Sequence, residues 1–162
     1  MSNGIGLTNG KLSYEDNLEI LRDNGIEVSK KLLNMGATLL KAKLSRVQQN
    51  VTSTSYTPLT EWQVGIKTSG GLVLVYLETS TYVDTQGSGT IQLLIDNDPK
   101  KESRSGGNTV GVDVMQPFMW MGELVKGTHT LKFKAKVGSG QVNFGSTTHD
   151  SALYVVEFNN GG

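Results

Sequence analysis

Residues 127–144 read GTHTLKFKAKVGSGQVNF, and from Thr130 to Val137 polar and apolar side chains alternate without interruption. Successive side chains of a β-strand point to opposite faces, so this period of two predicts a strand with one buried face and one face in water. The buried set is Leu131, Phe133, Ala135 and Val137, and the solvent-facing set is Thr130, Lys132, Lys134 and Lys136. Gly138–Gly140 then predicts a turn into a second short strand, Gln141–Gly145. Strands of this kind favour an antiparallel β-sandwich.

Two further segments share this period and extend the predicted sandwich. They are Trp62–Ile66 and Ile91–Ile95. Twenty glycines and only 36% hydrophobic residues agree with short strands joined by many turns. We therefore expect residues 56–162 to form one β-sandwich head domain.

Three other segments are apolar at both odd and even positions, unlike a strand with one face in water. They are Leu72–Leu77, Phe118–Met121 and, apart from Glu157, Ala152–Phe158. Each sheet of a sandwich has a single inner face, so these segments leave apolar side chains uncovered within one domain. A second copy of the chain would cover them, because interface cores are enriched in methionine and aromatic residues. Burial under an N-terminal helix is the alternative. On the first interpretation, the oligomer interface includes Phe118, Met119, Trp120 and Met121.

The first part of the chain has a different period. Residues recur every seven positions in two offset sets, which are Ile26, Leu33, Leu40 and Val47, and Lys30, Ala37, Leu44 and Val51. This spacing predicts a short coiled coil. A single amphipathic helix packed on its own domain is the alternative. We expect an α+β, mainly β chain, with a helical anchor and coiled-coil segment over residues 1–55. The interface residues expected there are Leu33, Ala37, Leu40, Leu44 and Val47.

Composition removes several classes of function. Fifteen Lys and Arg residues balance fifteen Asp and Glu residues among the 162, and a neutral chain lacks the basic excess that nucleic-acid binding requires. The chain has no cysteine, which excludes disulfides and cysteine-ligated zinc. No apolar run approaches the ~18 residues of a membrane span. We expect neither a nucleic acid nor a membrane as partner.

Residues with catalytic or metal-binding chemistry do not form a set. His149, Asp150 and Ser151 have the residue types of a nucleophilic triad, but neighbouring side chains of a strand point to opposite faces. Asp96–Asp98 begins like an EF-hand loop, but Lys101 stands where that loop requires glycine, so we interpret it as a turn. Neither histidine has a second ligand at helical or strand spacing, and the carboxylates are scattered. We expect no catalytic residue, cofactor or metal, and a protein that is not an enzyme.

Residues 123–158 also follow an order of features found in a known group of domains. Leu124 precedes Gly127-Thr128-His129-Thr130, the alternating strand, the glycine turn and a last apolar strand, Leu153–Phe158. In this order the segment resembles the closing strands of small jelly-roll domains in bacteriophage virion proteins, such as head and tail fibres. Broadly similar trimeric sandwiches form the C1q and tumour-necrosis-factor type heads. The resemblance implies a homotrimer located in the virion, with capsid or tail proteins as partners.

The function implied is that of a structural phage protein, a fibre or capsid decoration component attached through its N-terminal segment. Residues 1–25 are then the expected docking element. The chain has no extended shaft, so a short head fibre or decoration protein fits better than a long tail fibre. The alternative is the receptor- or carbohydrate-binding head of a tail fibre, with a host surface glycan as ligand. Asn97–Asn108 is interpreted as a long binding loop, with candidate residues Lys100, Lys101 and Arg104.

Overall fold

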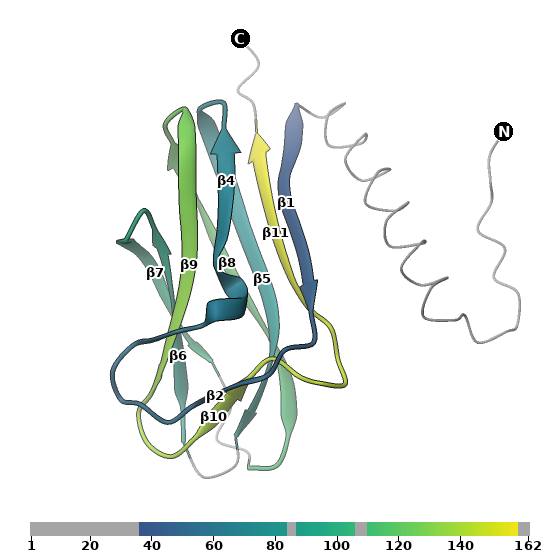
Figure 1. Cartoon of the computed structure of the whole chain (residues 1–162), viewed down its shortest axis with the longest axis vertical. Coiled ribbons are helices and arrows are strands. Elements are labelled where there is room, and N and C mark those ends of the chain that lie inside the picture. The colour runs from purple at the N-terminus through teal and green to yellow at the C-terminus, as the bar shows by residue number, and fades with distance from the viewer. Residues whose placement is uncertain (1–35, 84–86, 106–109, 159–162) are drawn as a thin grey trace, which may run out of the picture. The chain divides into compact units, whose positions relative to one another are not determined.

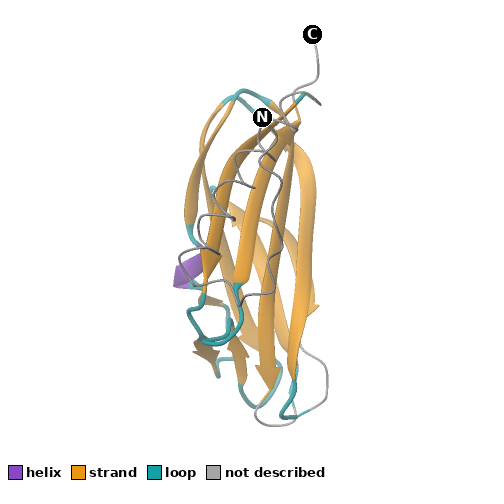
Figure 2. Cartoon of the chain, turned by 90° about the vertical axis from the view of Figure 1, so that its right-hand side faces the viewer, coloured by secondary structure: helices purple, strands orange, loops and turns teal. Residues whose placement is uncertain are grey.

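The computed structural model describes residues 36–83, 87–105 and 110–158, and this part of the chain is built from two antiparallel sheets (Figure 1). Sheet A contains β1 (Ala37–Ser45), β2 (Gln49–Val51), β5 (Gly71–Val83), β8 (Asp113–Leu124), β10 (Val142–Phe144) and β11 (Ser151–Phe158). Sheet B contains β3 (Thr57–Pro58), β4 (Val64–Thr68), β6 (Gly89–Ile95), β7 (Asp98–Ser105) and β9 (Gly127–Val137). Among the described residues the one helical element is the 3-10 turn η1 (Thr60–Trp62), purple in Figure 2.

One long strand organises each sheet. In sheet A, β5 pairs with β8 along one edge and with β11 and then β10 along the other, while β1 lies beside β11 and β2 beside β10. In sheet B, β9 pairs with β4 and β3 on one edge and with β6 on the other, and β7 lies outermost. The eight longer strands thus run β1-β11-β5-β8 and β4-β9-β6-β7. The predicted antiparallel sandwich is confirmed, and this strand order is compatible with a jelly roll.

The core lies between the sheets and consists of the side chains that point inward, which occupy alternate positions along each strand. Its largest fully buried side chains include Trp62, Phe133, Phe144, Leu59 and Leu77. Phe118 of sheet A meets Phe133 of sheet B edge to face, with ring centroids 5.6 Å apart and planes at 83°. Full burial of each large apolar side chain contributes about 1.5–3 kcal/mol to folding.

The predicted N-terminal helices are wrong wherever the structure describes them. Ala37–Ser45 is β1, paired with β11, and Gln49–Val51 is β2, paired with β10. The heptad spacing at these positions coincides with a strand that is irregular, because the register shifts between Leu39 and Lys41. Backbone pairing to an available sheet edge outweighs a weak helical period. The described fold is therefore β throughout, rather than α+β with a coiled coil.

The strands also start earlier than the expected head domain. Gly36–Gly162 forms one compact unit, so β1 and β2 belong with the strands of the predicted 56–162 head. The rest of the predicted helical segment, including Leu33 and the proposed docking residues 1–25, lies outside the described residues. No helix in the described part is long and apolar enough to cross a membrane.

Two lysines connect the sheets at their open sides. On one side the Lys43 ammonium group of β1 donates to the Glu61 carbonyl oxygen, lies 2.9 Å from the Glu61 carboxylate and is 5.8 Å from the ring centroid of Trp62. On the other side Lys101 of β7 donates to the Met119 carbonyl oxygen of β8 at 2.8 Å. Its ammonium group is 5.7 Å from the ring centroid of Phe118. Each contact joins an edge of sheet A to sheet B or its flanking turn.

This placement of β1 and β2 predicts how the chain responds to truncation. A chain starting at Gly36 keeps both strands and should unfold cooperatively. A chain starting at Thr57 loses the partner of β11, the buried Val51 and the Lys43 contact, so we expect aggregation or loss of the near-UV circular dichroism signal. A Thr57 chain with the same melting temperature as the Gly36 chain would show that these strands are dispensable.

Candidate functional site

The outer face of sheet A, which points away from sheet B, is apolar over most of its area. Residues opposite each other in an antiparallel ladder share a face, so the register gives the rows of this surface. Across β11, β5 and β8 the rows are Phe158, Leu72 and Glu123; Val156, Leu74 and Met121; Tyr154, Tyr76 and Met119; and Ala152, Glu78 and Pro117. On β1, the rows continue with Leu39, Ala42 and Leu44. We call this surface, together with Met115 in the row of Ser80, the apolar face.

Most of the apolar face is formed by the three segments that are apolar at both odd and even positions of the sequence. The sequence separates them by tens of residues, but in the fold β8, β5 and β11 are adjacent. Their outward side chains are therefore contiguous instead of scattered. Met119 is 54% exposed and Met121 52%, which is high for large apolar side chains in neighbouring rows. Contiguous exposed apolar patches on a folded domain mark interaction sites.

In the structure, some of the predicted interface residues point outward and others point into the core. Met119 and Met121 of β8 point outward, whereas Phe118 is in the core and Trp120 packs against it. In the N-terminal set, Leu44 lies on the apolar face, but Leu40 packs against the core and Ala37 is buried. Val47 is exposed in the loop after β1. Of the four residues predicted in β8, Met119 and Met121 lie on the apolar face, and Phe118 and Trp120 do not.

Several residues of the apolar face were missed as site residues. Tyr76 and Tyr154 lie opposite each other near its centre, and Tyr154 is 38% exposed. Their strands had been recognised as apolar on both faces, and that signal was enough to include them. What the sequence lacked was the pairing that places β11 and β8 on either side of β5.

The outer face of sheet B has the opposite chemistry. The alternation predicted for β9 is confirmed, since Lys132, Lys134 and Lys136 occupy its outward parity and Leu131 and Phe133 are buried. One sheet of the sandwich thus presents cations to water and the other presents methionine, leucine and tyrosine.

The predicted binding loop is a strand. Asp98–Ser105 is β7, joined to β6 by a two-residue turn in which Asp96 and Asn97 have φ of +53° and +70°. Positive φ at both positions fits the tight turn that matches strand twist, and Asn and Asp tolerate it. The interpretation of Asp96–Asp98 as a turn is confirmed. The prediction of a long loop over Asn97–Asn108 is wrong for the residues that the structure describes.

The three basic residues of that segment have different surroundings. Lys100 pairs with Asp98 at 2.6 Å, and Lys101 donates to the Met119 carbonyl oxygen. Arg104 lies opposite Thr90 in the β6–β7 ladder and is exposed. These residues therefore do not converge on a single site.

His149, Asp150 and Ser151 turn to different partners. Asp150 accepts from Arg46 Nε at 2.7 Å, and Ser151 is buried beside Thr79, with 3.3 Å between their hydroxyl oxygens. His149 Nδ1 is 3.6 Å from the carboxylate of Asp113. Within the described ranges, no group of three or more His, Cys, Asp or Glu side chains could hold a metal ion.

His129 has a structural role that the sequence did not reveal. Its Nδ1 lies 2.6 Å from Asp96 Oδ2 and its Nε2 lies 2.8 Å from the Val125 carbonyl oxygen. Both ring nitrogens face acceptors, so the doubly protonated ring satisfies both contacts. The hydrogen bond to Asp96, followed by that to Val125, raises the pKa of His129 above its usual range. The Thr130 N–H and then His129 lower the pKa of Asp96. This pair joins the β6–β7 turn to the β8–β9 turn.

Hydrogen bonds account for the burial of Glu157, the polar exception in its otherwise apolar segment. Its side chain faces inward and is only 2% exposed. Its carboxylate accepts from the backbone N–H groups of Ser69 and Gly70 at 3.0–3.1 Å and from the Ser69 hydroxyl at 3.0 Å. A buried carboxylate is tolerated because these donors compensate its desolvation. It attaches the β4–β5 turn to β11.

The His129–Asp96 pair predicts how stability depends on pH. Because the folded pKa of His129 is raised, its contribution is complete below the unfolded pKa and is lost as pH rises through the folded pKa. The contribution of Asp96 has the opposite sign and is lost as pH falls through its lowered pKa. In urea unfolding, His129→Gln should be less stable than the natural chain at pH 6, and the difference should shrink toward pH 9. His149→Gln is the matched control; if it alone removed this pH dependence, the assignment to His129 would fail.

No protein-family model matches this chain, and no curated protein matches it in sequence. The apolar face of sheet A and the lysines of sheet B are therefore the features from which a function can be inferred.

Proposed function

We propose that this protein is a structural subunit of a bacteriophage virion, a fibre or capsid decoration component that assembles as a homotrimer through the apolar face. The observation that carries the proposal is the contiguous apolar surface formed by β8, β5 and β11 on the side of sheet A away from the core. Its methionine and tyrosine side chains are residue types enriched in interface cores. A second copy of the same chain supplies a surface of equal chemistry.

The sheet order supports a jelly-roll head of the kind that the closing strands resemble. Strands β1-β11-β5-β8 form one sheet and β4-β9-β6-β7 the other, as a jelly roll requires. In the trimeric assembly, three copies bring their apolar faces toward a common axis. A closed ring of this kind buries the whole face and leaves no unpaired copy. The lysine-bearing outer face of sheet B then remains in contact with water.

A receptor- or carbohydrate-binding head is the second candidate, favoured by one observation. Tyr76 and Tyr154 lie side by side on the outer surface, and exposed aromatic rings are what a sugar ring stacks on. Of the two adjacent rows, one contains Leu74, Val156 and Met121, whose side chains offer no hydrogen bonds to hydroxyl groups, and the other offers the carboxylate of Glu78 alone. Ligand sites combine apolar walls with a few placed polar groups. The apolar face therefore fits a protein partner better than a glycan.

Assembly is tested by the mass of the full chain in solution. We expect native mass spectrometry at micromolar concentration to give three times the 17.5 kDa chain mass. Met119→Glu places a charge within the proposed interface and should shift the protein to monomer, weakening association at least about tenfold. Thr128→Glu is the matched control, because Thr128 is an exposed strand residue on sheet B, and it should leave the trimer intact. A monomeric natural chain, or equal effects of the two substitutions, would contradict the proposed interface.

Attachment to the virion is tested separately. The segment 1–25 is proposed as the docking element, so its deletion should abolish incorporation into purified phage particles while native mass spectrometry still shows a trimer. The readout is the amount of this chain per particle by quantitative mass spectrometry. Normal occupancy of the truncated chain would place the attachment elsewhere, and absence of the natural chain from particles would overturn the virion assignment.

A further inference from the structure

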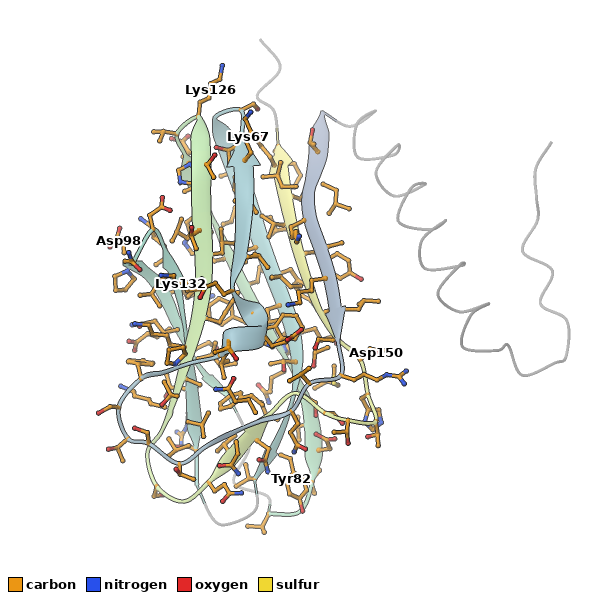
Figure 3. All side chains as sticks on the ribbon, in the orientation of Figure 1. Lys67, Tyr82, Asp98, Lys126, Lys132 and Asp150 are labelled. Atoms are coloured by element: carbon orange, nitrogen blue, oxygen red, sulfur yellow. The ribbon has the colours of Figure 1, made fainter. Side chains whose placement is uncertain are left out.

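The outward side of sheet B carries a row of cations with a regular spacing. Lys132, Lys134 and Lys136 follow each other on the outward parity of β9, and Lys67 lies opposite Thr128 on the neighbouring strand β4. From Thr128 to Lys136 the strand extends roughly 27 Å at about 3.4 Å per residue. Figure 3 shows Lys67 near one end of this sheet and Lys132 farther along β9. We call these four lysines the lysine face.

Carboxylates do not neutralise the lysine face within the described part of the chain. The cations that form ion pairs with carboxylates there are Lys43, Arg46 and Lys100, with the histidines, and none belongs to this face. Lys132 donates to the amide oxygen of Asn97 at 2.9 Å, and Lys136 lies 4.4 Å from the ring centroid of Tyr56. Both contacts orient an ammonium group without cancelling its charge.

The acidic side chains nearest to this face are already engaged. Asp96 accepts from His129 and from the Thr130 N–H, and Asp98 is paired with Lys100. Glu102, on the outer strand β7, shares a row with Gln92 and Lys134 and accepts from the Gln92 amide, which separates its carboxylate from the lysine row. Like charges two residues apart on one strand are about 7 Å from each other and repel, and water or an anion screens that repulsion. The arrangement is therefore complementary to a ligand with repeated negative charges.

The shape of the surface selects among polyanions. A single-stranded nucleic acid is bound through exposed aromatic rings on which its bases stack, and among the described residues the ring beside these lysines, Tyr56, already has the Lys136 ammonium group 4.4 Å from its centroid. A duplex is read by a helix or ribbon that enters a groove, whereas these lysines lie along the strands of a sheet. A linear acidic polysaccharide requires neither, because its carboxylate or sulfate groups recur along a flexible chain.

We propose that the lysine face binds a linear acidic polysaccharide, with Lys132, Lys134 and Lys136 each meeting one anionic group of the glycan. This goes beyond the assembly role and does not depend on it, because the lysine face lies on the opposite sheet from the apolar face. In the proposed trimer the three lysine faces point outward and are accessible together. The same surface in three copies would add avidity to contacts that are individually weak.

The test uses the full chain, with fluorescein-labelled heparin as probe and neutral dextran of similar length as its comparison. We expect heparin to bind at low ionic strength, dextran not to bind, and the heparin affinity to fall as salt increases. The triple variant Lys132→Gln, Lys134→Gln and Lys136→Gln should bind about tenfold more weakly or worse. Lys134→Gln alone, at the middle of the row, should weaken binding by about twofold to threefold and guards against misfolding of the triple variant.

A control of equal charge separates this surface from a general charge effect. Lys41→Gln and Arg46→Gln together remove two positive charges from β1 and the residue after it, and this variant should keep the heparin affinity within about twofold, whereas the matched pair Lys132→Gln and Lys134→Gln should lose several-fold. An equal loss in the control, no binding of heparin, or equal binding of dextran would each overturn the proposal. So would tighter binding of a single-stranded oligonucleotide than of heparin at the same charge concentration.

Failure of this proposal is distinguishable from failure of the assembly. The same heparin series on Met119→Glu should rank the lysine variants in the same order even where that protein is monomeric. A lysine series without effect on a protein that is still trimeric contradicts the polysaccharide site alone.

Discussion

A two-layer sandwich can bury one face of each sheet, and this limit governs the molecule. The inward-pointing side chains of the two sheets fill the shared core, where Phe118 of sheet A packs against Phe133 of sheet B. In sheet B the side chains that point away from the core are mostly polar and are in contact with water. In sheet A they are apolar across β8, β5 and β11. Sheet A therefore has two apolar faces, and the core of the sandwich covers one of them. Every proposal about assembly follows from that surplus.

The two outer faces of the sandwich have different chemistry, and each of the two proposals uses one of them. An apolar surface loses free energy in water and is stable when covered by a partner. A row of ammonium groups is soluble as it stands and attracts anions over distances set by the ionic strength. The sandwich keeps these chemistries on opposite sheets, so one face can be buried while the other stays accessible. Their separation also makes the two proposals independent, since a substitution on one face leaves the other untouched.

Polar contacts hold the periphery of the sandwich where apolar packing ends. Lys43 and Lys101 join the open sides of the two sheets, each through a carbonyl oxygen and an aromatic ring. Glu157 holds the β4–β5 turn, and His129 with Asp96 joins the β6–β7 and β8–β9 turns. All five are ionisable side chains, a type usually exposed to water. In the fold each also forms a hydrogen bond with a backbone group.

Local periodicity was sufficient to predict several of the strands and, for β9, which side chains face the core. The alternation over Thr130–Val137 gave both the strand β9 and the side on which its lysines lie, because a period of two has a single geometric solution. It also marked β5, β8 and β11 as strands without a wet face. Parity within β8 was available in principle, and it separates Met119 from Phe118 and Trp120.

Long-range pairing decided the rest. Residues 37–51 have a heptad spacing that a helix could use, but the free edges of β11 and β10 supply hydrogen-bond partners that no local pattern records. For the same reason Asn97–Asn108 looked like a basic loop, until pairing with β6 made Asp98–Ser105 a strand. The adjacency of β8, β5 and β11 is likewise tertiary. The sequence by itself determined which side chains are apolar and how they alternate, and only the tertiary structure decided which strands lie together, because ladder hydrogen bonds join residues far apart along the chain.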